Sequence, residues 1–156
     1  IIKARQINEK LGQVGQVTGV NTELIIDLLE KDYIPVISTI GCDSEGEIYN
    51  INADTAAAQI AGALKAESLI LMTDTSGILM DKDDPSSIIS KINGHELPGL
   101  IKQGIISEGM IPKAQCCMDA LKYGVKKVFI IDGRIPHSIL IETLTDEGAG
   151  TMLVQE

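Results

Sequence analysis

Two continuous apolar segments of strand length constrain the fold of this chain most. They span residues 68–72 and 127–132, and Leu, Ile, Val, Phe and Met dominate them. Strands that are buried on both faces of a parallel sheet have this composition, whereas strands with one wet face alternate apolar and polar residues. Between the two segments, apolar residues recur at helical spacing at Met110, Ala114, Cys117, Met118 and Leu121. We therefore predict an α/β fold, a three-layer αβα sandwich with a mainly parallel sheet.

Shorter segments extend this alternation along the rest of the chain. The sequence predicts further strands at residues 14–18, 35–40, 47–49 and 151–154. It predicts further helices at residues 24–31, 55–66, 96–103 and 138–144. Because there is no internal repeat and no linker, we predict one domain over residues 1–156. In such folds ligands bind beyond the carboxyl ends of the strands, and here the 73–77 loop and the 132–134 turn follow those ends.

Composition argues against several classes of partner. The chain has a net charge of −9, no Trp, one Phe and three Tyr, so it lacks the basic patch and the stacking rings of a nucleic-acid-binding protein. It has neither an apolar run of about 18 residues nor a signal-peptide pattern, so we expect no membrane segment and a cytoplasmic location. The cysteines and histidines have no metal-ligand spacing, so we expect no metal site formed by side chains.

A polar cluster follows the predicted hairpin at residues 50–54. Asn50 and Asn52 are two residues apart in an extended segment, so their amides point to the same side. Asp54 follows in the first turn of a helix, where a carboxylate suits the positive end of the helix dipole. The three groups suit a site that grips and orients a compact polar ligand. The same residue types are preferred helix caps, so a cap cluster is the alternative interpretation.

Lys113 is a second candidate for a functional residue. Pro112 favours the first turn of a helix, which places Lys113 at the positive end of the dipole. A cation is unfavourable there unless an anion shares the site. Backbone N–H groups at the start of a helix bind phosphate. Lys113 is therefore either part of a phosphate site or a solvated surface lysine, and the sequence leaves both interpretations open.

The loop at residues 73–77 is the third candidate. It reads Thr-Asp-Thr-Ser-Gly and follows the apolar 68–72 segment, which places it at the carboxyl end of a predicted strand. Asp74 in such a loop is able to hydrogen-bond a ribose, and Gly77 suits a tight turn. Turn chemistry alone also explains this composition.

Taken together, these segments resemble the acetylglutamate kinase branch of the amino acid kinase family. The matching sequences are Gly-Val-Asn-Thr at 19–22, Asn-Ile-Asn-Ala-Asp at 50–54, Thr-Asp-Thr-Ser-Gly-Ile-Leu at 73–79 and Glu-Gly-Met-Ile-Pro-Lys at 108–113. Two further matches are Ile-Asp-Gly-Arg-Ile-Pro-His at 131–137 and Thr-Asp-Glu-Gly-Ala-Gly-Thr at 145–151. The resemblance covers nearly the whole chain and implies the amino acid kinase fold. Sister kinases for aspartate, carbamate or uridylate share that fold but not the full set of sequences.

The resemblance implies ATP-dependent phosphorylation of the side-chain carboxylate of N-acetyl-L-glutamate in arginine biosynthesis, with ATP and Mg²⁺ as cofactors. It implies that Asn50 and Asn52 bind the acceptor and that Asp54 orders the catalytic groups. Lys113 would contact the transferring phosphoryl group. The residues that would line the nucleotide pocket are Thr73, Asp74, Gly77 and Met110.

The amino-terminal half of that family has no counterpart in this chain, which begins at Ile1. In the family, that half carries a second catalytic lysine, glycine-rich turns around the phosphates and an arginine that grips the acceptor. The resemblance thus makes the chain a partial domain, the nucleotide-binding carboxyl-terminal half plus part of the substrate-binding half. We expect that the chain by itself binds nucleotide weakly and does not turn over.

The resemblance also bears on regulation. His137, Glu147 and Gly148 match the region where arginine-inhibited members bind L-arginine as a feedback inhibitor. Those members are hexamers, so we expect a homo-oligomer. In photosynthetic organisms they bind the signalling protein PII, and a plastid stroma is then the expected location in a photosynthetic eukaryote. Two alternatives stay open: another kinase of the family, such as an aspartate kinase, and a nucleotide-binding module without catalysis.

Overall fold

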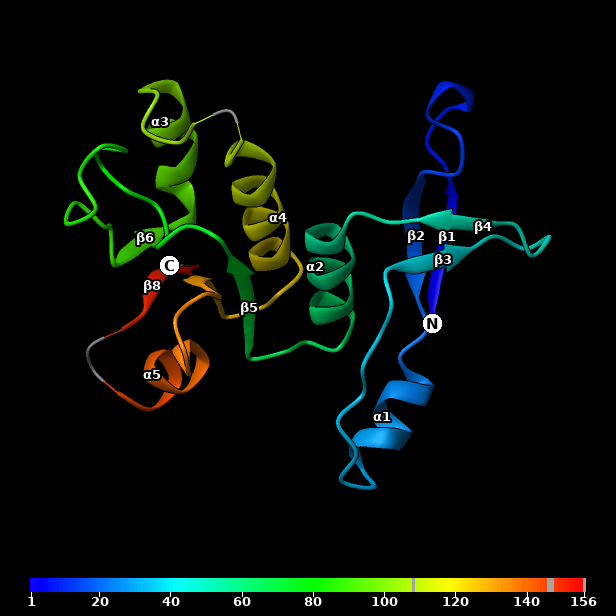
Figure 1. Ribbon diagram of the computed structural model, residues 1–156. Coiled ribbons are helices and arrows are strands. Elements are labelled where there is room, and N and C mark those ends of the chain that lie inside the picture. Colours follow the sequence, from blue (N-terminus) through cyan, green and yellow to red (C-terminus); the bar gives the residue numbers. More distant parts are fainter. Residues whose placement is uncertain (108, 146–147, 156) are drawn as a thin grey trace. The chain divides into compact units, whose positions relative to one another are not determined.

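The computed structural model describes residues 1–107, 109–145 and 148–155. Within these residues the chain forms two compact units, Ile1–Leu64 and Lys65–Glu156, and each contains its own four-stranded sheet (Figure 1). We call them unit 1 and unit 2. None of the described helices is long and apolar enough to span a bilayer. The single partial domain expected from the sequence stays a prediction.

Unit 1, whose residues are all described, pairs a mixed sheet with short helices. Its strands are β1 (Ile2–Gln6), β2 (Gly15–Val20), β3 (Ile40–Cys42) and β4 (Ile48–Asn50). Its helices are η1 (Glu9–Leu11), α1 (Glu23–Leu29) and α2 (Ala53–Ala63). The sheet order is β2-β1-β3-β4, in which β1 pairs antiparallel with β2 and parallel with β3. β3 and β4 form an antiparallel hairpin, so the hairpin predicted before residue 50 is confirmed.

Small residues allow close packing in the core of unit 1. One buried cluster contains Ile2, Ala4, Tyr49, Ile51 and Ala56. Helix α2 packs against β2, and it contributes Ala56 to this cluster. On β2, a Cβ added at Gly15 would lie 2.5 Å from Tyr49 Cβ, so only glycine permits this approach of the two strands. The core therefore fixes β4, the strand that ends at Asn50.

Unit 2 has a second mixed sheet. Its described strands are β5 (Ser68–Thr73), β6 (Lys91–Asn93), β7 (Lys127–Asp132) and β8 (Gly150–Val154). Its described helices are η2 (Gly94–Glu96), α3 (Leu97–Lys102), α4 (Ile111–Lys122) and α5 (Ser138–Leu144). The sheet order is β5-β7-β8-β6. β5 is parallel to β7 and β6 is parallel to β8, but β7 and β8 run antiparallel.

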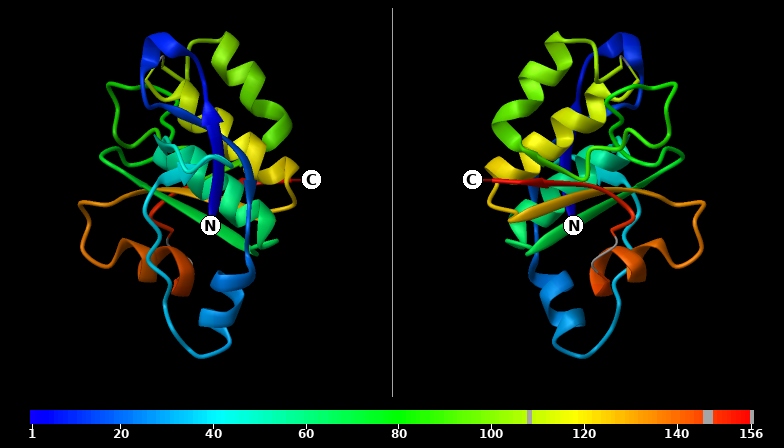
Figure 2. Two further views of the ribbon diagram at one scale, coloured as in Figure 1. Left: turned by 90° about the vertical axis from the view of Figure 1, so that its right-hand side faces the viewer. Right: turned by 90° about the vertical axis from the view of Figure 1, so that its left-hand side faces the viewer.

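Helices cover both faces of the second sheet. The views in Figure 1 and Figure 2 place α3 and α4 on one face and α5 on the other, and α4 and α5 both contact β7. In β7, the side chains of Val128, Ile130 and Ile131 are fully buried. This burial agrees with the continuous apolar run that predicted the strand. The predicted α/β class, with helices on both sides of a sheet, is confirmed, and the strand directions are mixed in each sheet.

The strand predicted at residues 35–40 is wrong. Residues 35–38 have no regular structure, and β3 begins at Ile40. Pro35 has no backbone N–H to donate to a ladder. The neighbouring side chains of Ile34 and Val36 are 90% and 96% exposed. Apolar composition did not extend β3 back to residue 35, because no strand of the described chain pairs with residues 35–38.

The helix predicted at residues 55–66 begins and ends earlier. It is α2, Ala53–Ala63, which starts earlier because Asn52 caps it. Its C-cap is Leu64, and Lys65 follows with a φ of 51°. This left-handed conformation commonly ends helices, and glycine adopts it with the least strain.

Candidate functional site

The carboxyl ends of β5 and β7 lie at one edge of the second sheet, because the two strands are parallel. β8 begins at the same edge, since it runs antiparallel to β7. The segment after β5 reaches β8, where the Ile78 N–H donates to Thr151 Oγ1 at 2.8 Å in a buried hydrogen bond. The edge at which the sequence predicts a ligand is therefore formed by β5, β7 and the beginning of β8.

A cavity of about 480 Å³ lies between the segment that follows β5 and the connection from α3 to α4. Gly77 and Met110, two of the predicted nucleotide-binding residues, both line it. The other lining residues are Thr75, Ile78, Leu79, Met80, Asp81, Lys82, Gln103, Gly104, Ile105, Ile106 and Ser107. Ligand pockets typically enclose about 300–1,000 Å³, so this cavity has a suitable size. Sequence reasoning missed the walls at 80–82 and 103–107, because their residue types carry no motif that indicates ligand contact.

A second cavity, of about 620 Å³, lies at the opposite edge of the sheet, where β6 and β8 end and β5 and β7 begin. It is lined by Gly94, His95, Pro98, Gln115, Met118, Leu121, Lys122 and Gln155. None of the predicted site residues is among them. Although it is larger, it lies away from the carboxyl ends of β5 and β7, so we take the first cavity as the candidate nucleotide site.

Gly77, which lines the first cavity, has a backbone conformation that favours glycine. Its φ of 134° is one that residues with a side chain rarely adopt. A Cβ at this position would lie 2.7 Å from Thr151 Oγ1 and 3.1 Å from the Thr151 nitrogen. Glycine thus lets the segment after β5 approach β8 closely enough for Ile78 to bond to Thr151.

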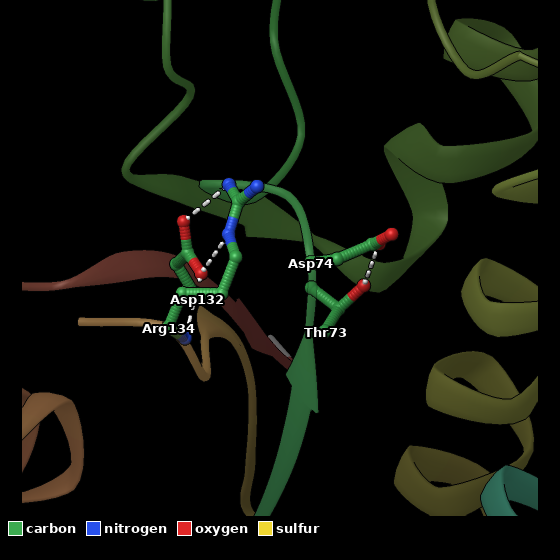
Figure 3. Close-up of polar contacts among 4 residues, drawn as sticks. All are labelled: Thr73, Asp74, Asp132 and Arg134. Carbon is green, nitrogen blue, oxygen red and sulfur yellow. Dashed lines mark hydrogen bonds and ion pairs between the residues drawn. The ribbon is translucent and has the colours of Figure 1, made fainter. Parts of the chain in front are cut away.

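Two pairs of polar side chains lie at the carboxyl ends of β5 and β7 (Figure 3). On β5, Thr73 Oγ1 donates to Asp74 Oδ1 at 3.3 Å, and both residues lie outside the lining of the first cavity. On β7, the carboxylate of Asp132 accepts from Arg134 Nε at 2.9 Å and from Nη2 at 2.8 Å. Hydrogen bonds from the Arg134 side chain and backbone lower the pKa of Asp132, which is 4% exposed, to about 2. The Gly133 N–H donates to the Thr73 carbonyl at 2.8 Å, so the turn after β7 fixes the beginning of the 73–77 loop. Sequence reasoning placed this turn at a strand end and gave Arg134 no role.

Lys113 lies in the first turn of α4, where the sequence predicts it. Helix α4 begins at Ile111, Pro112 is in its first turn, and Met110 is the N-cap residue without a capping side-chain bond. The positive end of this helix therefore lies beside the first cavity, which Met110 lines. Lys113 itself is half-buried. Its contact with a phosphoryl group stays a prediction.

In unit 1, the three polar residues of the 50–54 segment follow strand β4. Asn52 is the N-cap of α2, and its Oδ1 accepts from the Thr55 N–H at 3.1 Å. The interpretation as a helix cap is therefore confirmed for Asn52. Asn50 ends β4 with an exposed side chain, and Asp54 is half-buried in the first turn of α2. That Asn50 and Asp54 share one site with Lys113 stays a prediction.

The residues predicted to bind L-arginine are described only in part. His137 is the exposed N-cap residue of α5 and has a φ of 62°. Gly148 is exposed with a φ of 70°, while Glu147 lies outside the described residues. Glu142 on α5 accepts from the Ala149 N–H, which ties α5 to the segment before β8. An inhibitor site in this region stays a prediction.

The sequence and fold together place the chain in a known class of enzymes. A model of the amino acid kinase family matches residues 1–132. This chain belongs to the amino acid kinase family.

Within that family, the chain is similar to acetylglutamate kinases. It is 59% identical to the acetylglutamate kinase of Brachyspira hyodysenteriae over 145 residues. This matched region covers 93% of this chain and 50% of the relative. It is 54% identical to the acetylglutamate kinase of Thermosynechococcus vestitus over 155 residues. This matched region covers 99% of this chain and 52% of the relative. The chain therefore spans about half the length of the curated relatives it matches.

Solved structures share the fold. The protein smu.665 from Streptococcus mutans is 32% identical, with a TM-score of 0.82 over 100% of this chain and 57% of that chain. The N-acetylglutamate synthase of Neisseria gonorrhoeae, solved with coenzyme A and L-arginine, is 24% identical, with a TM-score of 0.89 over 99% of this chain and 36% of that chain. At that identity the second likeness concerns the fold alone. The amino acid kinase fold implied by the sequence is confirmed.

Proposed function

We propose that this chain is the nucleotide-binding portion of an acetylglutamate kinase, which transfers the terminal phosphoryl group of ATP to the side-chain carboxylate of N-acetyl-L-glutamate. The main support is an identity of 50–59% to eight acetylglutamate kinases across 92–99% of the chain. The cavity that Gly77 and Met110 line, beyond the carboxyl ends of parallel strands, supports a nucleotide site in unit 2.

The chemistry of this reaction requires positioning and charge neutralisation rather than a base. A glutamate side chain has a pKa of about 4.3, so the acceptor is already ionised at neutral pH. One of its oxygens attacks the γ-phosphorus, a new P–O bond forms, and the bond to the bridging oxygen of ADP breaks without a proton transfer. A site of this kind has no need of a histidine.

Each candidate residue then has a role in the proposed reaction. Lys113, in the first turn of α4, contacts the oxygens of the transferring phosphoryl group. Asp54 orients a lysine and does not abstract a proton. Asn50 binds the acceptor, and Asn52 contributes through its amide N–H groups, because its Oδ1 caps α2.

Mg²⁺ would accompany ATP and would supply positive charge to the phosphates. In kinases it is typically held by phosphate oxygens, waters and one or two carboxylates. Among the described residues there is no group of three or more His, Cys, Asp or Glu that could hold a metal ion. Inhibition by L-arginine, a homo-oligomer, binding of PII and a cytoplasmic location remain predictions of the family resemblance.

Nucleotide binding by the purified chain is the first test. In an NMR titration, AMP-PNP is expected to bind weakly and to shift the amide signals of Gly77 and Met110. Binding that leaves both signals unchanged contradicts the proposed nucleotide site. The chain alone is expected to consume no ATP with N-acetyl-L-glutamate, and measurable consumption contradicts its expected inactivity.

Acceptor choice is the second test, and it needs both halves of the enzyme. A hybrid is made in which the amino-terminal half of the Brachyspira hyodysenteriae relative precedes this chain. We expect the hybrid to phosphorylate N-acetyl-L-glutamate and to leave L-aspartate unchanged. Transfer to L-aspartate instead would favour an aspartate kinase and reject the proposed acceptor.

A further inference from the structure

The turn of the β3–β4 hairpin is closed by a single carboxylate, that of Asp43. Its Oδ1 accepts from the Glu45 N–H at 2.9 Å and from the Glu47 N–H at 3.0 Å. The Asp43 N–H in turn donates to the Glu47 carbonyl at 3.1 Å. Aspartate commonly organises turns by accepting from the backbone two residues further on. Asp43 therefore sets the conformation from which β4 starts.

The second oxygen of this carboxylate bonds to Tyr49, the residue that precedes Asn50. The Tyr49 hydroxyl donates to Asp43 Oδ2 at 2.9 Å, in a partly buried contact. This hydrogen bond lowers the pKa of Asp43 and raises the pKa of Tyr49. At neutral pH the donor is therefore protonated and the acceptor ionised, the combination that gives a strong charge-assisted hydrogen bond.

The position of Tyr49 decides where Asn50 points. Tyr49 is 8% exposed and belongs to the core of unit 1, whereas the side chain of Asn50 is exposed. Successive side chains of a strand point to opposite faces, so a register shift of one residue would bury Asn50 and expose Tyr49. β3 and β4 pair through three residues each, so the ladder between them is short. Hydrogen bonds outside this ladder therefore contribute more to fixing the register of β4.

Backbone bonds hold the same segment from the other side. The Asn50 N–H donates to the Gln13 carbonyl at 2.8 Å, and the Ile51 N–H donates to the Thr39 carbonyl at 2.9 Å. The side chain of Tyr49 lies against Gly15, where an added Cβ would lie 2.5 Å from Tyr49 Cβ and 3.2 Å from the ring atom Cγ. The ring and the backbone are thus fixed by the core, and the hydroxyl connects them to the turn.

We propose that Asp43 and Tyr49 are positioning residues for the acceptor. The Asp43 carboxylate holds the hairpin in the one register in which Tyr49 faces the core and Asn50 faces the acceptor. This inference rests on the proposed function, in which Asn50 binds N-acetyl-L-glutamate. Neither residue touches the reacting atoms in this scheme.

Two conservative variants of the hybrid enzyme test the inference, because acceptor binding requires both halves. Tyr49→Phe keeps the ring in the core and removes the hydroxyl, and Asp43→Asn keeps an acceptor for the turn and removes the charge. Affinities for N-acetyl-L-glutamate and for AMP-PNP are measured by NMR titration. We expect either variant to weaken acceptor binding about three- to tenfold, the scale of one lost hydrogen bond, and to change AMP-PNP binding less than twofold. Because both changes remove the same charge-assisted hydrogen bond, the double variant is expected to bind the acceptor no more weakly than the weaker single variant.

The matched control is Tyr33→Phe, which removes the hydroxyl of a tyrosine that is 61% exposed in the same unit. It is expected to change neither affinity. Hydrogen exchange at the Asn50 and Ile51 amides gives a readout without ligand, and Tyr49→Phe is expected to accelerate it while Tyr33→Phe is not.

Three results would overturn the inference: unchanged acceptor binding in both hairpin variants, an equal loss for both ligands, or unchanged exchange at Asn50 in Tyr49→Phe. A parent hybrid that binds AMP-PNP but not N-acetyl-L-glutamate would instead reject the acceptor site proposed for this chain. In that case the exchange measurement still decides whether Asp43 and Tyr49 position Asn50.

Discussion

The close approach of Gly77 to Thr151 on β8 leads to a prediction about stability. The substitution Gly77→Ala places a methyl group 2.7 Å from Thr151 Oγ1 and 3.1 Å from the Thr151 nitrogen. It also forces a residue with a side chain into a φ of 134°, which costs about 1–3 kcal/mol. Overpacking adds about 1–3 kcal/mol, and loss of the buried bond from Ile78 to Thr151 adds about 1–3 kcal/mol. One movement of the loop relieves the clash and breaks the bond, so these costs overlap, and we expect a total of about 2–4 kcal/mol.

Urea unfolding of the purified chain, followed by circular dichroism, measures this loss of stability. Gly104→Ala is the matched control in the same unit, because Gly104 has a φ of 75° but no atom within 4 Å of an added Cβ. It carries backbone strain without a clash, so we expect a loss of about 1 kcal/mol. If Gly77→Ala and Gly104→Ala lower the unfolding free energy equally, the close approach to Thr151 has no energetic importance and the reasoning is refuted.

Three further predictions concern catalysis, a helix end and pH. In the hybrid enzyme, Lys113→Met is expected to lower kcat about 10²–10³-fold, by analogy with removal of one oxyanion donor, and a kcat within threefold of the parent would exclude the proposed role. Lys65→Gly is expected to raise the unfolding free energy by about 1 kcal/mol because Lys65 has a φ of 51°. By contrast, Gln115→Gly at an exposed position in the interior of helix α4 is expected to lower it by about 1 kcal/mol, as urea unfolding will show. Asp132 has a folded pKa of about 2, below that of an unfolded aspartate, so its contribution to stability is complete above about pH 3.9 and is lost as the pH falls through 2. Thermal unfolding between pH 5 and 2 should therefore depend less on pH in Asp132→Asn, and an unaltered dependence would contradict the role of the Arg134 contact.

The parts of the fold that were predictable from sequence are those in which local composition and burial agree. The apolar run of β7 predicted a strand buried on both faces, and Val128, Ile130 and Ile131 are fully buried. Pro112 predicted a helix start, and α4 begins at Ile111. In both cases neighbouring residues in the chain determine the outcome, so a short window of sequence contains the necessary information.

The parts that escaped prediction depend on residues far apart in the chain. The conformation of Gly77 is required by Thr151, and the bond from Ile78 to Thr151 joins residues 73 positions apart. The apolar run at 35–40 has strand composition, but no partner strand pairs with residues 35–38 in the described chain. β8 is antiparallel to β7, which the order of elements along the chain does not specify.

In the candidate site, too, some features were predictable from the sequence and others were not. The resemblance assigned Gly77 and Met110 to one pocket, and both line the first cavity. The bond between Asp132 and Arg134 was not predicted, because a motif of three residues at a strand end does not reveal which side chains fold back on each other. The capping role of Asn52 was predicted only as an alternative, since an asparagine serves equally well as a helix cap and as a ligand contact.

The exposed loop around Pro35 has a consequence for the behaviour of the chain in concentrated solution. Ile34 and Val36 are almost fully exposed, and residues 33–40 contain no charged side chain. Uncharged stretches rich in β-branched residues stack into intermolecular cross-β fibres when nothing interrupts them. The proline ring removes one donor from the middle of this stretch and hinders its pairing with a second molecule. Pro35 is therefore expected to lower the tendency of this exposed segment to pair with the same segment of a second molecule.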